Sequence, residues 1–201
     1  MNPHIVRKKE FITQTQCAEL NAWVDLAITN KWLDLGRGEN ASWNMNSRLT
    51  TRQYGHRFVY PQIVYQIFDK ITDALGLTDL PKSIVGGGRG GVVVSCTYAD
   101  GDVYEHIDPM EGDRHVLRCN IMSQQADLGA DLYIGNKHID VEVGELHCYL
   151  PSDVPHYVTT AKGQTPRIMW MFGYQCSKER FVRLTNTPAK AGFFMSEIYG
   201  T

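Results

Sequence analysis

The sequence lacks the features that mark several classes of protein. It has no CxxC pair, so neither a zinc knuckle nor a disulfide framework is indicated. Its cysteines are odd in number and widely separated, at Cys17, Cys96, Cys119, Cys148 and Cys176. No apolar run approaches the ~18 residues of a membrane span. The N-terminal segment MNPHIVRKKEF lacks the apolar core that a secretion signal requires. We therefore expect a cytoplasmic protein without a membrane segment.

A strong excess of charge of either sign is also absent. The 201 residues carry a net charge of −2, and 43% hydrophobic and 21% charged residues are ordinary for a globular protein. This balance argues against a broad nucleic-acid surface, so no nucleic-acid partner is expected. Repeats and linkers are missing too. We expect one domain over residues 1–201, helical at about 1–80 and a β-barrel at about 83–176, and nothing in the pattern indicates an oligomeric state.

Two helices are predicted in the N-terminal part. Thr13 can cap the first, with Gln16 in the capping-box position. An apolar stripe at helical spacing follows, formed by Leu20, Trp23, Val24, Ala27 and Ile28. Pro61 suits the first turn of the second helix, and Gly76 ends it. The segment 34–57 between them is polar and aperiodic, and a loop of this length is often a lid or a binding segment. It bears Arg37, Arg48, Arg52 and Arg57.

From about residue 83, short β-branched and aromatic runs alternate with glycine, proline and aspartate turns. The candidate strands are Val92–Thr97, Val103–Asp108, Val116–Ser123, Asp131–Ile134, His138–Val143, Leu146–Leu150, Tyr157–Ala161 and Arg167–Tyr174. About eight short strands at this spacing suggest a sandwich, jelly roll or barrel. The expected plan is mainly β, with two N-terminal helices packed outside a C-terminal barrel.

His106 and Asp108 are the most informative polar residues in these strands. They are two residues apart, so in an extended strand their side chains share one face, together with Tyr104. Two histidines and one carboxylate form the ligand set of non-haem Fe(II) oxygenases, which leave positions open for O2 and a cosubstrate. The alternative interpretation is a solvent-exposed strand face that tolerates histidine and aspartate.

The second histidine must come from another strand. The candidates are His115, His138, His147 and His156. Of these, His156 alone has a basic residue, Arg167, at the start of the next strand. Arginine presents a planar fork of donors that suits the distal carboxylate of 2-oxoglutarate. Taken singly, His156 also fits a surface position after a proline turn, and Arg167 fits an exposed strand edge.

The segment from Tyr98 to Asp108, YADGDVYEHID, carries a family resemblance. It resembles the YxxGxxYxxHxD signature of the prolyl 4-hydroxylase-like branch of the Fe(II)/2-oxoglutarate oxygenases. It departs from that signature in one respect, because a single residue separates Tyr104 from His106 where the signature has two. The shortened spacing affects the match at Tyr104 rather than at the expected metal ligands. We expect Tyr104 to contact the substrate.

Two later stretches extend the resemblance. Leu128–Asp131 resembles the GGxT-like turn of the family, and Val143–Arg167 resembles its closing G…H…G…K/R segment. The similarity covers about residues 92–175. It implies a double-stranded β-helix, the jelly roll also found in cupins, with a metal at one mouth.

The resemblance also implies a cofactor set. Fe(II) would be held by His106, Asp108 and His156, while 2-oxoglutarate would pair with Arg167 and Tyr98. O2 would be the cosubstrate, with ascorbate as an accessory reductant. Related halogenases have a small residue in the place of Asp108, so the acid favours hydroxylation.

Arg118 and Asn120 alternate with Leu117, Cys119 and Ile121, which gives that strand one polar and one apolar face. If the polar face lines the barrel mouth, we expect Arg118 to bind a substrate carboxylate and Asn120 to orient substrate or cosubstrate. If it faces solvent, both are routine surface residues.

The sequence thus predicts a 2-oxoglutarate-dependent dioxygenase that hydroxylates a C–H bond of an amino acid, peptide or small carboxylated metabolite. Two alternatives remain: a cupin-like metal dioxygenase or isomerase that does not use 2-oxoglutarate, and a non-catalytic β-sandwich binding module.

Overall fold

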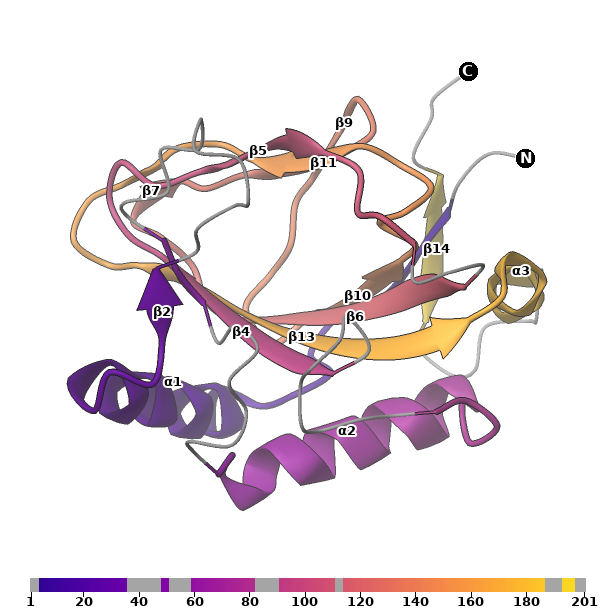
Figure 1. Ribbon diagram of the computed structural model, residues 1–201, viewed down its shortest axis with the longest axis horizontal. Helices are drawn as coiled ribbons and strands as arrows, with labels where there is room; N and C mark the ends of the chain where they lie inside the picture. The colour runs from indigo at the N-terminus through magenta and orange to yellow at the C-terminus, as the bar shows by residue number, and fades with distance from the viewer. Residues whose placement is uncertain are drawn as a thin grey trace.

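Two antiparallel sheets face each other in the computed structural model, which describes residues 4–35, 48–50, 59–81, 91–110, 114–186 and 193–197 (Figure 1). The strands are β1 (His4–Lys8), β2 (Asp34–Leu35), β3 (Arg48–Thr50), β4 (Val92–Thr97), β5 (Val103–His106), β6 (His115–Gln124), β7 (Leu128–Gly129), β8 (Leu132–Ile134), β9 (Lys137–Ile139), β10 (Leu146–Tyr149), β11 (His156–Val158), β12 (Ala161–Lys162), β13 (Arg167–Cys176) and β14 (Phe194–Glu197). The larger, eight-stranded sheet has the order β14-β1-β10-β6-β13-β4-β3-β2, and the smaller, four-stranded sheet has the order β5-β11-β8-β9. The strands β12 and β7 form a separate pair.

Both predicted helices are present and cover the outer face of the larger sheet (Figure 1). Helix α1 (Gln14–Thr29) begins with the predicted capping box between Thr13 and Gln16. Helix α2 (Gln62–Leu75) ends at Gly76, which adopts the left-handed conformation that glycine tolerates. A third helix, α3 (Lys178–Asn186), was not predicted. None of the helices in the described part of the chain combines the length and apolar character that a membrane crossing requires.

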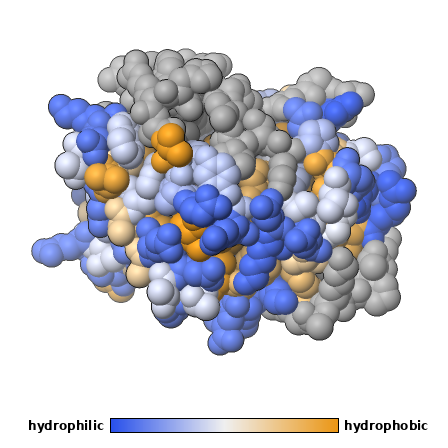
Figure 2. All heavy atoms as spheres, turned by 90° about the horizontal axis from the view of Figure 1, so that it is seen from below, coloured by the Kyte–Doolittle hydropathy of each residue, from blue (hydrophilic) through white to orange (hydrophobic). Residues whose placement is uncertain are grey.

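The main hydrophobic core lies between these helices and the larger sheet. Trp170, Phe172 and Tyr174 of β13 point into it and meet Trp23 of α1 and Phe68 of α2. Each such side chain contributes about 1.5–3 kcal/mol when it is fully removed from water. The view onto the helices in Figure 2 is mostly hydrophilic, with hydrophobic residues only scattered over it. The apolar faces of the helices are therefore turned toward the sheet.

A second apolar cluster lines the space between the two sheets. It is formed by Ile5, Val103, Ala126, Ala130, Leu132, Ile134, Ile139, Tyr149, Val154, Val158 and Ala161. The central strands β6, β10 and β13 of the larger sheet therefore bury both faces, one against the helices and one inside the barrel. The predicted architecture, a mainly β double-stranded β-helix with helices outside it, is confirmed.

Several predicted boundaries are wrong, and the strand expected over Tyr157–Ala161 is divided between β11 and β12. The fifth strand ends at His106 rather than Asp108, because Pro109 follows and cannot continue the ladder of hydrogen bonds. The strand expected over His138–Val143 ends at Ile139, and the carbonyl of the next residue, Asp140, accepts a hydrogen bond from the Arg7 side chain. Within the segment 34–57, residues 34–35 and 48–50 pair as β2 and β3. Arg37, Arg52 and Arg57 lie outside the described residues, so the lid remains a prediction.

Candidate metal centre

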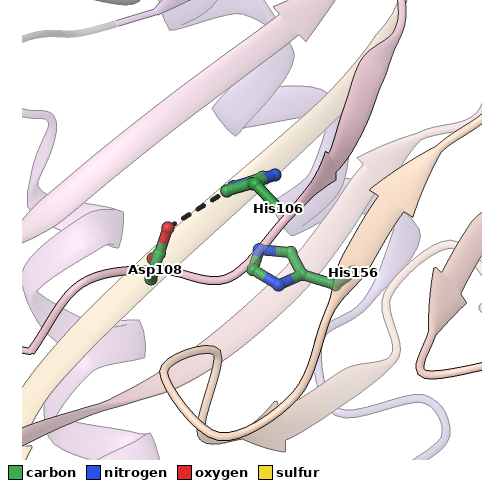
Figure 3. A group of neighbouring side chains, drawn as sticks. All are labelled: His106, Asp108 and His156. Carbon is green, nitrogen blue, oxygen red and sulfur yellow. Dashed lines mark ion pairs between the residues drawn. The ribbon is translucent and has the colours of Figure 1, made fainter.

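Two histidines on neighbouring strands of the smaller sheet face each other. His106 is the last residue of β5, His156 is the first of β11, and antiparallel pairing makes them direct partners. Their ring centroids are 4.2 Å apart, with 50° between the ring planes. Figure 3 shows both rings beside the carboxylate of Asp108.

Asp108 reaches this site from the loop after β5. The sequence had suggested instead that Asp108 shares one face of a strand with His106. Its backbone N–H donates to the carbonyl of Pro151 at 3.0 Å. That bond ties the loop to the turn leading into His156. It leaves Asp108 Oδ1 3.4 Å from His106 Nε2.

Both imidazoles are held by a backbone carbonyl two residues earlier in the chain. His106 Nδ1 lies 2.9 Å from the Tyr104 carbonyl, and His156 Nδ1 lies 3.3 Å from the Val154 carbonyl. A carbonyl can only accept, so each Nδ1 carries a proton, and Nε2 is the ring atom left to bind a metal. Such outer hydrogen bonds are typical of metal-binding histidines, where they fix the tautomer and the orientation of the ring.

This arrangement fits a divalent cation. Donor atoms of His106, Asp108 and His156 all lie within 4.8 Å of one another, in the one such His/Cys/Asp/Glu group found among the described residues. With Nδ1 bonded to a carbonyl, the 3.4 Å contact between His106 Nε2 and Asp108 Oδ1 is favourable only when a proton or a metal cation lies between the two atoms.

The carboxyl group of Asp108 stays ionised over the whole physiological range. Burial alone raises its pKa, but the contact with His106 and the positive charge of Arg118 outweigh burial and lower the pKa to about 2. Protons therefore do not compete with a metal for this oxygen near neutral pH.

The polar face of β6 points into the barrel. Leu117, Cys119 and Ile121 join the core beneath the helices, so Arg118 and Asn120 face the opposite way, toward the smaller sheet. Arg118 is the register partner of Tyr149, whose ring packs against that of His156, so Arg118 lies at the metal end of the interior. Of the two alternatives drawn from the sequence, the structure shows that this face lines the barrel interior and does not face solvent. The binding roles of Arg118 and Asn120 stay predictions.

The inward residues of β10 continue this polar interior. Tyr149 packs edge-on against the ring of His156, with 5.5 Å between ring centroids. His147, two residues earlier, is the register partner of Asn120 on β6, and its Nε2 lies 3.3 Å from Asn120 Nδ2. In the sequence, the alternation of His147 and Tyr149 with the apolar Leu146 and Cys148 is the pattern that could have identified this face.

Arg167 begins β13 and is buried, with only 4% of its surface exposed. It lines a small pocket of about 50 Å³, together with Met122, Leu132 and Ile139 from three other strands. Burial, and after it the positive charge of Arg167, lowers the pKa of His147 to about 3. The register pairs Tyr149 with Arg118 and His147 with Asn120, and Met122, the next inward residue of β6, lines the pocket beside Arg167. Tyr149, His147 and Arg167 therefore follow one another from the metal end into the barrel interior.

The two tyrosines of the predicted site lie in different places. Tyr104 is 39% exposed on β5, with its ring centroid 5.3 Å from that of His106, at the mouth of the site. Tyr98 instead packs against the core beneath the helices and interacts with Cys96. The structure does not bring Tyr98 together with Arg167, because residues 92, 94, 96 and 98 share the helix-facing side of β4 and its extension.

A polar network beside the metal centre was not predicted. His115 Nδ1 lies 2.8 Å from Ser152 Oγ and 3.1 Å from Asp153 Oδ1, and Lys178 Nζ lies 2.6 Å from Asp153 Oδ2. It joins the starts of β6 and α3 to the turn that precedes His156. The remaining candidate ligand, His138, is exposed on β9.

The two sheets and the covering helices form the fold of solved prolyl hydroxylases, as comparison with known structures shows. A prolyl-4-hydroxylase from Pseudomonas putida superposes with a TM-score of 0.57 at 14% sequence identity, covering 88% of this chain and 94% of the other.

Two further structures are similar. The viral collagen prolyl hydroxylase of Paramecium bursaria Chlorella virus-1, in complex with 2-oxoglutarate, gives a TM-score of 0.59 at 11% identity, covering 86% of this chain and 96% of the other. A prolyl hydroxylase from Trichoplax adhaerens, in complex with a hypoxia-inducible factor peptide fragment, gives 0.64 at 14%, covering 94% and 89%. No family model matches the sequence, and no curated protein does. At these identities the similarity establishes the fold alone.

Proposed function

We propose that this chain is an Fe(II)- and 2-oxoglutarate-dependent dioxygenase that hydroxylates a C–H bond and releases succinate and CO2. The observation that carries the proposal is the convergence of His106, Asp108 and His156, with both imidazoles locked in the tautomer that offers Nε2. These three residues would hold the iron, and the iron and 2-oxoglutarate would supply the oxidising power.

The remaining interior residues have roles in binding and orientation. Arg167, at the far end of the interior, would pair with the distal carboxylate of 2-oxoglutarate through its planar fork. Asn120 would orient the cosubstrate, while Arg118 and Tyr104, at the metal end, would contact the substrate. The buried walls of the barrel exclude water from the reacting groups. The buried arginine favours this function over a cupin-like enzyme without 2-oxoglutarate.

The substrate class we propose is an amino acid, a peptide or a small carboxylated metabolite. The Trichoplax enzyme with the same fold was solved with a peptide, which supports the peptide option, and the viral enzyme was solved with 2-oxoglutarate. We also propose that residues 1–201 form a single domain, since the helices and both faces of the larger sheet share continuous cores.

The test is the metal-dependent conversion of 2-oxoglutarate. Purified protein with Fe(II), 2-oxoglutarate and O2 is expected to form succinate, and metal chelation is expected to stop it. Metal binding that is indifferent to 2-oxoglutarate would favour the cupin-like alternative, and absence of metal binding would favour the non-catalytic module.

A further inference from the structure

His147 and Asn120 form a buried polar pair that the site described so far does not fully explain. His147 is 1% exposed and Asn120 is 5% exposed, and they are neighbours on β10 and β6 with side chains toward the barrel interior. Asn120 Oδ1 and His147 Nδ1 have no hydrogen-bond partner anywhere in the described parts of the chain. Burying such atoms unsatisfied costs about 1–3 kcal/mol each, so a group that satisfies them would be bound favourably.

The pair always offers a donor. If the amide nitrogen of Asn120 donates to His147 Nε2, as the atoms are placed, the neutral ring carries its proton on Nδ1, which is the unsatisfied donor. If the amide were reversed, its NH2 group would become the unsatisfied donor instead. Burial and the charges of Arg167 and Arg7 lower the pKa of His147 to about 3, so the ring is neutral at physiological pH.

The position of the pair lies toward Arg167 rather than toward the metal. Tyr149, which separates His147 from the metal end along β10, contacts the ring of His156. His147 lies two residues further along β10, opposite Asn120, whereas Tyr149 lies opposite Arg118. Met122, the next inward residue after Asn120 on β6, lines the 50 Å³ pocket beside Arg167. A carboxylate in this part of the interior would meet both the guanidinium and the unsatisfied donor.

We propose that His147, held by Asn120, is a second binding residue for the distal carboxylate of 2-oxoglutarate and makes the site selective for a dicarboxylic cosubstrate. This inference rests on the function proposed above. The imidazole adds a hydrogen bond without adding charge. Selectivity follows because a 2-oxo acid that ends in a methyl group leaves the buried donor without a partner.

The experiment measures cosubstrate binding without turnover. Protein loaded with Mn(II) is titrated calorimetrically with 2-oxoglutarate and with 2-oxopentanoate, which has the same chain length and no distal carboxylate. In His147→Phe, which keeps an aromatic ring and removes the donor, the affinity for 2-oxoglutarate should fall about tenfold to a hundredfold, the usual worth of a hydrogen bond to a charged group. The affinities for Mn(II) and for 2-oxopentanoate should stay the same.

Two more variants keep the test decisive. His147→Gln retains an N–H donor and should recover most of the lost affinity, and Asn120→Leu should reproduce the loss by releasing the imidazole, even if His147→Phe fails to fold. Unchanged 2-oxoglutarate affinity in His147→Phe, or an equal loss for both 2-oxo acids, would overturn the inference. If the unmodified protein shows no Mn(II)-dependent binding of 2-oxoglutarate, it is the proposed function that fails.

Discussion

His106 and His156 are direct partners across the β5–β11 pair, and each directs Nδ1 to the carbonyl two residues before it. The same local arrangement on two strands leaves one ring nitrogen of each histidine as a ligand atom at the shared site. The ligand pair is therefore organised by the backbone before any metal binds, and preorganisation of this kind reduces the cost of binding.

Replacing Asp108 with alanine should abolish 2-oxoglutarate turnover. The substitution removes the only anionic ligand of the centre. Loss of a residue that merely hydrogen-bonds to a metal ligand typically lowers metal affinity roughly 10–100-fold, so the loss here should be at least as large. Binding of Mn(II), followed by calorimetry, and formation of succinate would measure both effects. Near-normal turnover in Asp108→Ala would remove Asp108 from the site.

The ionised Asp108 should also make a pH-dependent contribution to the stability of the metal-free protein. Its pKa is lowered in the folded state, so the contribution is present above the unfolded value near 3.8 and is lost as the pH falls to about 2. A shift of this size corresponds to about 2 kcal/mol. The free energy of unfolding of the unmodified protein should exceed that of Asp108→Asn at pH 5–6, and the difference should shrink below pH 4. A difference that does not vary with pH would contradict the assignment.

Replacing Arg167 with alanine should mainly weaken binding of 2-oxoglutarate. The loss of a two-pronged contact with a carboxylate should cost roughly 100-fold in affinity, while Mn(II) binding stays unchanged. Arg167→Lys keeps the charge and loses the fork, so its affinity should be intermediate. Equal affinities in all three proteins, measured calorimetrically, would show that the distal carboxylate binds elsewhere.

The network around Asp153 should act on the metal through the position of His156. Asp153→Asn weakens the contacts with His115 and Lys178 that hold the turn before His156, and we expect metal affinity to fall about tenfold. A matched control is Glu142→Gln, which removes one partner of the exposed pair with Lys9 and should leave metal binding unchanged. Equal metal affinities in the two variants would assign the network to general stability.

Much of the fold was predictable because its signals are local. The capping box at Thr13, the terminal Gly76 and the alternation of β6 depend on neighbouring residues, and the structure has them as predicted. Strand β1 was missed because its sequence, HIVRK, is short and charged, and it becomes a strand by pairing with β10 and β14. The pairing partners are more than a hundred residues away, beyond the reach of any local pattern.

The candidate site was predictable to a different degree. The spacing of His106 and Asp108, the position of Arg167 after His156 and the resemblance together indicated this ligand set, and the structure brings the three ligands together. The alternation of side chains along the strand placed Arg118 and Asn120 on one face. Only the structure, with the helices on the opposite face, shows that this face lines the barrel interior. Tyr98 follows the same alternation to the opposite side of the sheet. His147 was considered only as a metal ligand, because its pairing with Asn120 depends on the register between β10 and β6.

The bond from the Asp108 N–H to the Pro151 carbonyl has a consequence for how this centre can be altered. The loop is anchored by its main chain, so shortening the side chain at position 108 should leave the anchor in place and open a gap of carboxylate size between two intact imidazoles. Such a variant is a suitable starting point for chemical rescue with formate or halide, supplied from solution as a replaceable third ligand.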